Sequence, residues 1–306
     1  ISTNADKVRD DASFGVDGSN STVGVWDGGN IRDTHTEFGG RVTLGEIVSL
    51  SNHSTHVGGT IGAAGVNSNA TGMAPMVNLV SYDFSNDEAE MALEAAPGPV
   101  GGINLSNHSY GFISGWANGS YSGTSGPHFF GLWDEMDLPS ESHFFGIYDT
   151  TAALWDQIVF DAPYYLPVKS SGNDRNDGAP SNGTTFYRFQ GAGWAEETYD
   201  DTMHPGDDGA PAGYDTVSAN GNAKNILTVG AVNDAVSGGV RSLANATMSS
   251  FSGWGPTDDG RVKPDVVGNG VALFSSGSAN DSAYSTLSGT SMSAPNVTGS
   301  ATLLQE

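Results

Sequence analysis

The sequence contains no cysteine, which excludes disulfide bonds as a source of stability. With 306 residues the chain does not need them, because a fold of that length buries roughly 75% of the surface that the unfolded chain exposes. The absence assigns no compartment, since many exported bacterial proteins also lack cysteine. No apolar run approaches the roughly 20 residues that cross a bilayer. Ile1 stands in place of a methionine, which fits a processed N-terminus or the boundary of a longer sequence.

Basic residues are scarce. Eleven Lys and Arg residues stand against 35 Asp and Glu residues, which gives a formal net charge of −24. Such a surface repels phosphate backbones and anionic lipids, so we expect neither nucleic acid nor a membrane as a partner. The charge indicates a solvated acidic surface suited to salty water. It also favours binding of cations such as Ca²⁺, and the two interpretations are compatible.

Short apolar runs rich in β-branched residues recur between polar turns. Because they lack strict alternation, they predict strands of a parallel sheet that is covered on both faces. The expected strands are residues 22–26, 77–80, 102–105, 166–168 and 226–230. The expected helices are residues 54–64, 87–96 (with Met91, Leu93 and Ala95 toward the sheet) and 151–160. This alternation predicts an α/β fold with a mostly parallel central sheet and helices on both faces.

Two stretches interrupt this alternation. Residues 112–148 contain many aromatic residues and glycines with no clear period, and residues 178–222 form a second irregular, acidic stretch. Long segments without periodicity are commonly functional loops or disordered. Because no internal repeat or linker divides the chain, we expect one domain, residues 1–306, with irregular insertions at about 112–148 and 178–222.

Three short segments place a reactive side chain at the end of an expected strand or at the start of an expected helix. Asp27 follows the first expected strand, at the sheet edge where α/β folds place their sites. His53 begins a helix, and Ser291 precedes a helix of small residues with Pro295 in its first turn. Each is ambiguous alone: such an Asp is usually structural, His53 with His56 could bind a metal, and such a serine is usually a cap.

The set of three is more specific than its members. Its order along the chain, Asp, His, Ser, is the order of the subtilisin triad and differs from that of chymotrypsin and of the α/β-hydrolases. Residues 289–295 read Gly-Thr-Ser-Met-Ser-Ala-Pro. In this motif, and in the segments around His53 and Asp27, the chain resembles the subtilase family, and it is more similar to the larger members of that family than to the smallest ones. Residues 72–75 and 251–265 also resemble subtilase segments. The resemblance extends from Val23 to Leu304 and implies a subtilisin-like three-layer fold.

The resemblance implies a secreted serine endopeptidase that hydrolyses peptide bonds through an acyl-enzyme. Ser291 would attack the scissile carbonyl, and His53 would act first as a base and then as an acid. Asp27 would orient the imidazole and stabilise its charged form. The oxyanion donors would be the Asn173 side chain and the Ser291 backbone N–H.

The same resemblance implies where substrate binds. Ser109, Tyr110 and Gly111 look like the edge segment that pairs with an extended peptide, and Ser171 and Gly172 would line the other side of the first pocket. The carboxylate of Asp174 could favour basic substrate side chains at the rim of this pocket, or it could simply be solvated.

The chain departs from the family pattern at several positions. Gly28 stands where most relatives have Ser or Thr, so a hydroxyl bond to the preceding aspartate is missing unless backbone N–H groups or water replace it. Ser54 replaces a glycine and would crowd or cap the start of its helix. The helix after Ser291 ends close to Glu306, where subtilases normally continue. The resemblance therefore implies a C-terminal piece that is missing, cleaved or separate.

Calcium is common in the family, so the resemblance implies a structural calcium ion. The candidate ligands are Asp174 with Asn176 and Asp177, and Asp200 and Asp201 with Asp207 and Asp208. Solvated acidic turns are the alternative. The expected partners are a protein or peptide substrate and a propeptide before maturation, and the expected state is a monomer. Two other functions stay open: a catalytically silent subtilase-like binding module, and a peptide ligase on the same scaffold.

Overall fold

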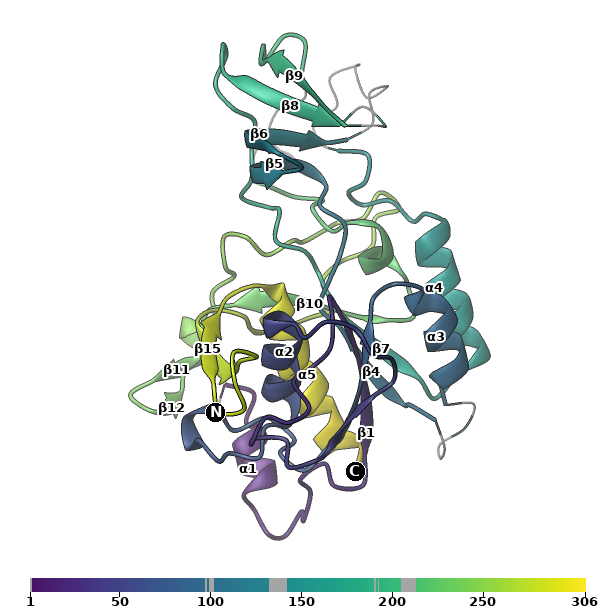
Figure 1. The fold of residues 1–306 in the computed structure, drawn as a ribbon, viewed down its shortest axis with the longest axis vertical. Coiled ribbons are helices and arrows are strands. Elements are labelled where there is room, and N and C mark those ends of the chain that lie inside the picture. Colours follow the sequence, from purple (N-terminus) through teal and green to yellow (C-terminus); the bar gives the residue numbers. More distant parts are fainter. Residues whose placement is uncertain are drawn as a thin grey trace.

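The computed structural model describes residues 2–96, 98, 102–131, 142–189, 191, 193–204 and 213–306. Its centre is a seven-stranded sheet in the order β13-β10-β7-β4-β1-β3-β2 (Figure 1). Every neighbouring pair in this sheet is parallel. The strands are β1 (Thr22–Asp27), β2 (Val42–Leu44), β3 (Asn78–Asp83), β4 (Leu105–His108), β7 (Leu166–Ser170), β10 (Leu227–Val232) and β13 (Val266–Asn269).

Helices cover both faces of this sheet. On one face lie α2 and α5, and on the other lie α3 and α4 (Figure 1). The expectation of a mostly parallel sheet between two helical layers is confirmed. The helices are α1 (Ala5–Arg9), α2 (Asn52–Gly62), α3 (Asp87–Glu94), α4 (Thr150–Asp161) and α5 (Thr290–Gln305). Short elements connect these strands and helices: η1 (Ser68–Ala70), η3 (Ala219–Asn222), β11 (Val236–Ser237), β12 (Val240–Arg241), η4 (Leu243–Asn245), β14 (Leu273–Ser276) and β15 (Tyr284–Leu287).

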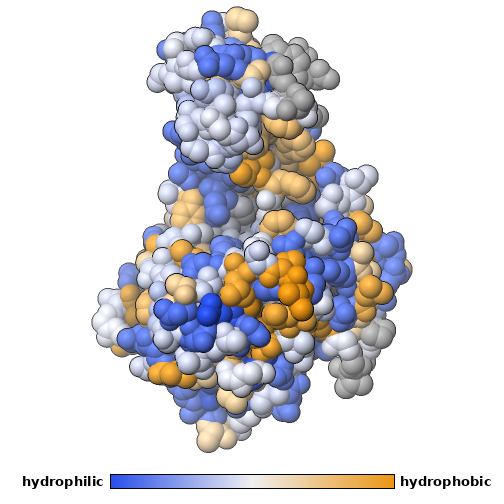
Figure 2. All heavy atoms as spheres, viewed as in Figure 1, coloured by the Kyte–Doolittle hydropathy of each residue, from blue (hydrophilic) through white to orange (hydrophobic). Residues whose placement is uncertain are grey.

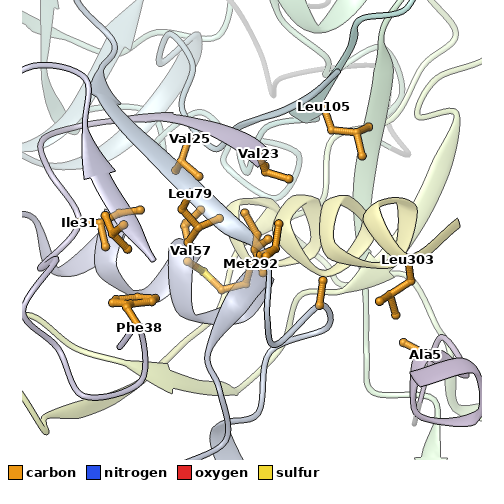
Figure 3. Packing of buried hydrophobic residues seen from close by; sticks show 14 residues of the cluster. Ala5, Val23, Val25, Ile31, Phe38, Val57, Leu79, Leu105, Met292 and Leu303 are labelled. Atoms are coloured by element: carbon orange, nitrogen blue, oxygen red, sulfur yellow. The ribbon is translucent and has the colours of Figure 1, made fainter. Parts of the chain in front are cut away.

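Side chains of β1 point alternately to the two faces of the sheet, so this strand contributes to the hydrophobic core on each face. Successive side chains of a strand point to opposite faces, so Val23 and Val25 pack toward α2 and α5. There they meet Val57 and Met292 in the cluster that Figure 3 shows. Trp26 points the other way and stacks on Tyr82 and His108 beneath α3 and α4.

Gly24 is required by the packing of β1. A Cβ atom at this position would lie only 2.3 Å from Cζ3 of Trp26, so the indole ring occupies the space that a side chain would need. The Trp26 Nε1 atom donates to Glu90 on α3 at 2.8 Å, which satisfies the one polar atom of the ring.

The two stretches that we expected to be irregular instead build a second sheet. It has four strands in the order β5-β6-β8-β9 and projects from the body at the top of Figure 1. Its strands are β5 (Gly115–Tyr121), β6 (Thr124–Phe130), β8 (Thr185–Phe189) and β9 (Trp194–Thr198). The prediction failed because β6 pairs with β8, more than fifty residues away, and no local pattern reveals such pairing.

Smaller differences concern the ends and faces of elements. The fourth strand begins at Leu105 instead of residue 102, because Gly102 adopts a left-handed φ of 71° and Ile103 bridges to Ala95. Met91 and Ala95 are buried as expected, but Leu93 is 83% exposed, since it lies on the opposite side of α3. Pro295 is the sixth residue of α5, one turn later than expected.

The surface that Figure 2 shows is mainly hydrophilic, with a hydrophobic patch on the body below the projecting sheet. Within the described residues, none of the helices has the length and apolarity that crossing a lipid bilayer requires.

The projecting sheet has its own small core of Trp116, Phe129, Phe186 and Tyr199. We therefore expect Phe186→Ala, which leaves a cavity costing about 3–5 kcal/mol, to loosen this sheet selectively. Hydrogen exchange should speed up at the amides of β5, β6, β8 and β9 and stay unchanged in β1 and β4. The matched control, Phe38→Ala in the main core, should speed up exchange throughout. Equal effects of Phe186→Ala on both sheets would contradict a separate core.

Candidate active site

The residues singled out from the sequence gather at the carboxyl edge of the central sheet. Asp27 is the last residue of β1, Ser109 follows β4, and Asn173 comes three residues after β7. The strands β1, β4 and β7 are direct neighbours, so these positions are separated by one or two strand spacings of roughly 4.8 Å. Open parallel sheets bind ligands at this edge.

A hydrogen-bonded pair joins β1 to α2. The Nδ1 atom of His53 lies 2.8 Å from Oδ1 and 2.9 Å from Oδ2 of Asp27, whose side chain is buried. An ionised carboxylate only accepts, so Nδ1 carries the proton and Nε2 is left with a lone pair. Burial lowers the pKa of His53, but the hydrogen bond and the charge of Asp27 outweigh it and raise that pKa above its ordinary value.

Two further donors complete the surroundings of Asp27. The Gly28 N–H donates to Oδ1 at 2.7 Å, and the Ser54 hydroxyl donates to the same atom at 3.0 Å. Ser54 therefore neither crowds nor caps the helix: it supplies the hydroxyl bond that Gly28 cannot. The cap comes from Ser51, which accepts from the Ser54 N–H.

Phe84 explains why the hydroxyl comes from Ser54 and not from position 28. A Cβ atom on Gly28 would lie 3.1 Å from Cε1 of Phe84, so a side chain there would press against the ring. The Phe84 ring in turn packs on Tyr110 at 5.3 Å between centroids. The two departures from the family pattern thus compensate each other.

His56 has a structural environment. It is fully buried, and its Nε2 atom bonds the Leu273 carbonyl at 2.9 Å, while burial lowers its pKa to about 4. It is therefore neutral near pH 7. Because His53 is directed to Asp27 and His56 to Leu273, the two rings do not converge on a common metal ion.

Ser291 stands in the first turn of α5, two residues after Gly289, whose φ of 152° favours glycine. Its hydroxyl donates to the Ser109 carbonyl at 3.0 Å, and the Ser109 hydroxyl donates to the Ser291 carbonyl at 2.8 Å. That carbonyl needs an outside donor because Pro295, four residues on, has no N–H. Helices α2 and α5 share one cluster, in which Val57 lies one turn after His53 and Met292 follows Ser291 (Figure 3).

The expected row of hydrogen bonds is thus incomplete in this structure. Among the described residues, the Ser291 hydroxyl bonds Ser109 and not His53. A serine hydroxyl rotates freely to the best acceptor within reach, and here that acceptor is the backbone carbonyl of Ser109.

Asn173 is fixed by its own side-chain oxygen. Oδ1 accepts from the Thr290 N–H at 2.9 Å and from the Thr290 hydroxyl at 3.0 Å. Because the atom that accepts from these two donors must be the amide oxygen, the Nδ2 group at the other end of the amide is free to donate. A Cβ atom built on Gly289 would lie 3.6 Å from that Nδ2 and 3.7 Å from the Ser291 nitrogen, so both donors flank the same point.

A pocket of about 130 Å³ opens beside Ser291. Of the five residues expected to bind substrate, four line it, while Ser109 instead bonds Ser291. Sequence reasoning missed several lining residues. A lysine at the end of a buried strand, at position 169, was the available signal for one of them. The lining residues are Tyr110, Gly111, Phe112, Ile113, Lys169, Ser170, Ser171, Gly172, Asn173, Asp174, Ser218, Thr290 and Ser291.

The calcium candidates fit a metal poorly. The carboxylate of Asp200 accepts exposed hydrogen bonds from the Thr202 N–H and hydroxyl within a turn. The N–H of Asp201 donates to the side-chain oxygen of Asn182. Asp174 and Asp177 lie close enough that the charge of Asp177, after burial, helps to raise the pKa of Asp174 to about 7.

Ca²⁺ takes six to eight oxygens, so Asn176, backbone carbonyls or water would have to supply those that the two carboxylates do not. Nowhere in the described ranges do three or more His, Asp or Glu side chains form a metal-binding group. Asp207 and Asp208 lie outside the described residues.

Comparison with known proteins gives a consistent result. A model of the subtilase family matches residues 31–306. The C5a peptidase of Streptococcus pyogenes is 51% identical over 59 residues, which are 19% of this chain and 5% of that protein. The serine protease AprX of Bacillus subtilis is 36% identical over 101 residues, 29% of this chain and 22% of that protein. The matches thus span only a small part of these relatives.

Solved structures share the fold. The CspB protease of Clostridium perfringens aligns with a TM-score of 0.60 and 17% identity, covering 99% of this chain and 85% of that one. A cold adapted subtilisin-like serine proteinase aligns with a TM-score of 0.52 and 21% identity, and the alignment covers 94% of this chain and 76% of that one.

The buried hydroxyl of Ser54 gives a direct test of the surroundings of Asp27. We expect Ser54→Ala to lower the free energy of unfolding by about 1.5–3 kcal/mol, the usual worth of a hydrogen bond to a charged group. Ser85→Ala is the matched control, because its hydroxyl also bonds a carboxylate, that of Asp83, but in an exposed place. That control should change stability by less than about 0.5 kcal/mol. Urea unfolding measures both, and equal small effects would show that the Ser54 bond is dispensable.

Proposed function

The chain belongs to the subtilase family of serine proteases, and on this premise we propose that it is a secreted endopeptidase using Asp27, His53 and Ser291. The observation that carries the proposal is the Asp27–His53 pair at the sheet edge, where Ser291 begins α5 beside the Asn173 amide. The short matches to C5a peptidase and AprX, both named as peptidases, support peptide hydrolysis. The strongly acidic composition suits exposure to salty surroundings outside the cell.

The first half of the reaction acylates the enzyme. The Ser291 hydroxyl rotates from the Ser109 carbonyl toward Nε2 of His53, which takes its proton as Oγ attacks the peptide carbonyl. The resulting imidazolium gives that proton to the leaving amine, and the C–N bond breaks. Water then attacks the ester, with His53 again as base, and releases the acid and the free serine. Asp27 stabilises the imidazolium in both halves.

The oxyanion of each tetrahedral intermediate needs donors that are already in place. Nδ2 of Asn173 is available because its Oδ1 is held by Thr290. The Ser291 N–H is available because the first N–H groups of a helix have no intrahelical partner. The positive end of α5 adds to the stabilisation.

Substrate would bind as an extended strand along residues 109–111, with one side chain in the pocket between this segment and residues 171–172. A monomer and removal of a propeptide belong to the same proposal. Structural calcium stays a prediction, for which the Asp174–Asp177 pair supplies the better of the two candidate sets.

A catalytically silent binding module is the second candidate. It is favoured by one observation: among the described residues, the Ser291 hydroxyl bonds the Ser109 carbonyl and not His53.

Labelling of Ser291 separates the two. A fluorophosphonate probe should react stoichiometrically at Ser291, because the serine is activated by His53, and the adduct is located by mass spectrometry. Ser291→Ala should abolish labelling, whereas Ser293→Ala, whose hydroxyl bonds the Thr290 carbonyl inside α5, should retain it. An unlabelled wild-type protein would support the silent module. Amide products formed with an added amine would instead indicate a ligase.

The pH profile tests the role of His53. The base must be neutral to accept a proton, so kcat/KM should rise with pH through the pKa of His53. Since Asp27 raises that pKa, the midpoint of the acidic limb should lie above the ordinary value of 6.5. Asp27→Asn should shift the limb to lower pH and reduce kcat. A wild-type midpoint at or below 6.5 is the result that contradicts this assignment.

A further inference from the structure

A buried lysine lines the pocket beside Ser291. Lys169 is the fourth residue of β7, its side chain is 2% exposed, and it forms part of the pocket wall together with Tyr110 and Ser170. Asn173 and Ser291 belong to the same lining and are more exposed than the lysine. A substrate side chain bound in this pocket would therefore share it with the lysine.

All hydrogen-bond partners of Lys169 are neutral. Its Nζ atom donates to the Tyr110 carbonyl, to the Ser170 carbonyl at 3.2 Å and to the Ser170 hydroxyl at 3.4 Å. Within the described part of the chain, no carboxylate lies at ion-pair distance from this ammonium group. The geometry thus satisfies the donors of Lys169 with neutral groups, and its charge faces the Tyr110 ring, with Nζ 5.3 Å from the ring centroid, without a carboxylate in an ion pair.

Asp87 is the acidic residue whose charge acts on Lys169, and it balances the charge of the ammonium group only weakly. Asp87 is engaged by the Tyr110 hydroxyl, and burial raises the pKa of Asp87 to about 7. Burial also lowers the pKa of Lys169 to about 7, and Asp87 offsets only part of this effect. The neighbouring His108 is kept neutral by burial and by the lysine charge. A buried ammonium in such surroundings is stabilised strongly by an added carboxylate.

The other charged lining residue, Asp174, is placed differently. It follows Asn173 directly and is partly exposed. Its carboxylate lies beside Gly172, where a Cβ atom would be 3.4 Å from Oδ2, and burial together with the charge of Asp177 raises its pKa to about 7. A carboxylate with its pKa raised in this way carries only part of its charge near pH 7, so it opposes an acidic ligand less than a fully ionised carboxylate would. The lysine should therefore decide which charge the pocket accepts.

We propose that the pocket beside Ser291 accepts an acidic side chain, Glu or Asp, from the residue whose carbonyl Ser291 attacks, with Lys169 as its counter-ion. The proposal rests on the proposed endopeptidase function and names its substrate class. The cavity of about 130 Å³ is close to the roughly 150 Å³ that holds a benzene molecule, so it has room for one side chain of medium size.

Hydrolysis of matched peptides tests the proposal. Chromogenic peptides that differ only in the residue before the scissile bond, as Glu, Gln, Phe or Lys, should give kcat/KM for Glu at least about tenfold above Gln. Lys169→Met, which keeps an unbranched side chain without charge, should bring the Glu-to-Gln ratio close to one. Lys169→Arg should retain a preference for Glu, and Asp174→Asn should leave it in place.

Other outcomes overturn the assignment. Equal rates for Glu and Gln in the wild-type protein would do so, without any variant having to fold. So would a preference for Lys that Asp174→Asn abolishes, because Asp174 would then control the pocket. If Lys169 had only a structural role, Lys169→Met would change the stability of the protein but would leave the ratio of kcat/KM for Glu and Gln peptides unchanged.

A binding measurement keeps this proposal separate from the proposed activity. Uncleaved peptides with Glu or Gln at the same position are titrated into Ser291→Ala protein by calorimetry, which requires no catalysis. Tighter binding of the Glu peptide supports the pocket assignment even if fluorophosphonate labelling fails. A protein that labels at Ser291 but binds both peptides equally well is an endopeptidase without the proposed selectivity.

Discussion

The hydrogen bond between Asp27 and His53 connects the last residue of β1 to the first turn of α2, and the rest of the site is arranged around it. A buried carboxylate is costly unless several donors surround it. Here the donors come from the imidazole, from the Gly28 backbone and from the Ser54 hydroxyl. Two of these belong to α2, so the charge of Asp27 fixes how that helix starts above the sheet. The orientation of His53 follows from the same constraint.

The start of α5 depends on a complementary arrangement. A proline inside a helix leaves one carbonyl without its usual partner. In this chain that carbonyl belongs to Ser291, and Ser109 donates to it from the end of β4. Asn173 attaches the same turn to the end of β7 through Thr290. Backbone groups that the helix itself leaves unpaired thus bind α5 to the segments that follow two strands.

Much of this could be predicted from the sequence. The five expected strands and the helices starting near His53, Asp87, Thr150 and Thr290 correspond to observed elements, because buried parallel strands and helices have strong local patterns of apolar residues. The order of Asp27, His53 and Ser291 along the chain pointed to the right family. Short edge strands such as β2 were missed, since three residues carry too little pattern.

Features that depend on tertiary contacts could not be predicted. Ser54 was recognised as unusual, but its role became clear only once its hydroxyl was seen on Asp27 and the Phe84 ring against Gly28. Lys169 looks like an ordinary residue of a strand until the fold shows that its hydrogen-bond partners are neutral backbone and hydroxyl groups and that it lines the pocket beside Ser291. The exposure of Leu93 depends on how α3 packs, which the run of apolar residues does not determine.

The projecting sheet has a mechanical consequence for the pocket. Residues 109–111 lead into β5 and β6, and residues 171–174 lead toward β8 and β9, so each wall of the pocket continues into one half of that sheet. The pairing of His128 with Tyr187 and of Phe129 with Arg188 closes the two halves into a loop of chain. The two walls are therefore connected twice, once through the central sheet and once through the pairing of β6 with β8.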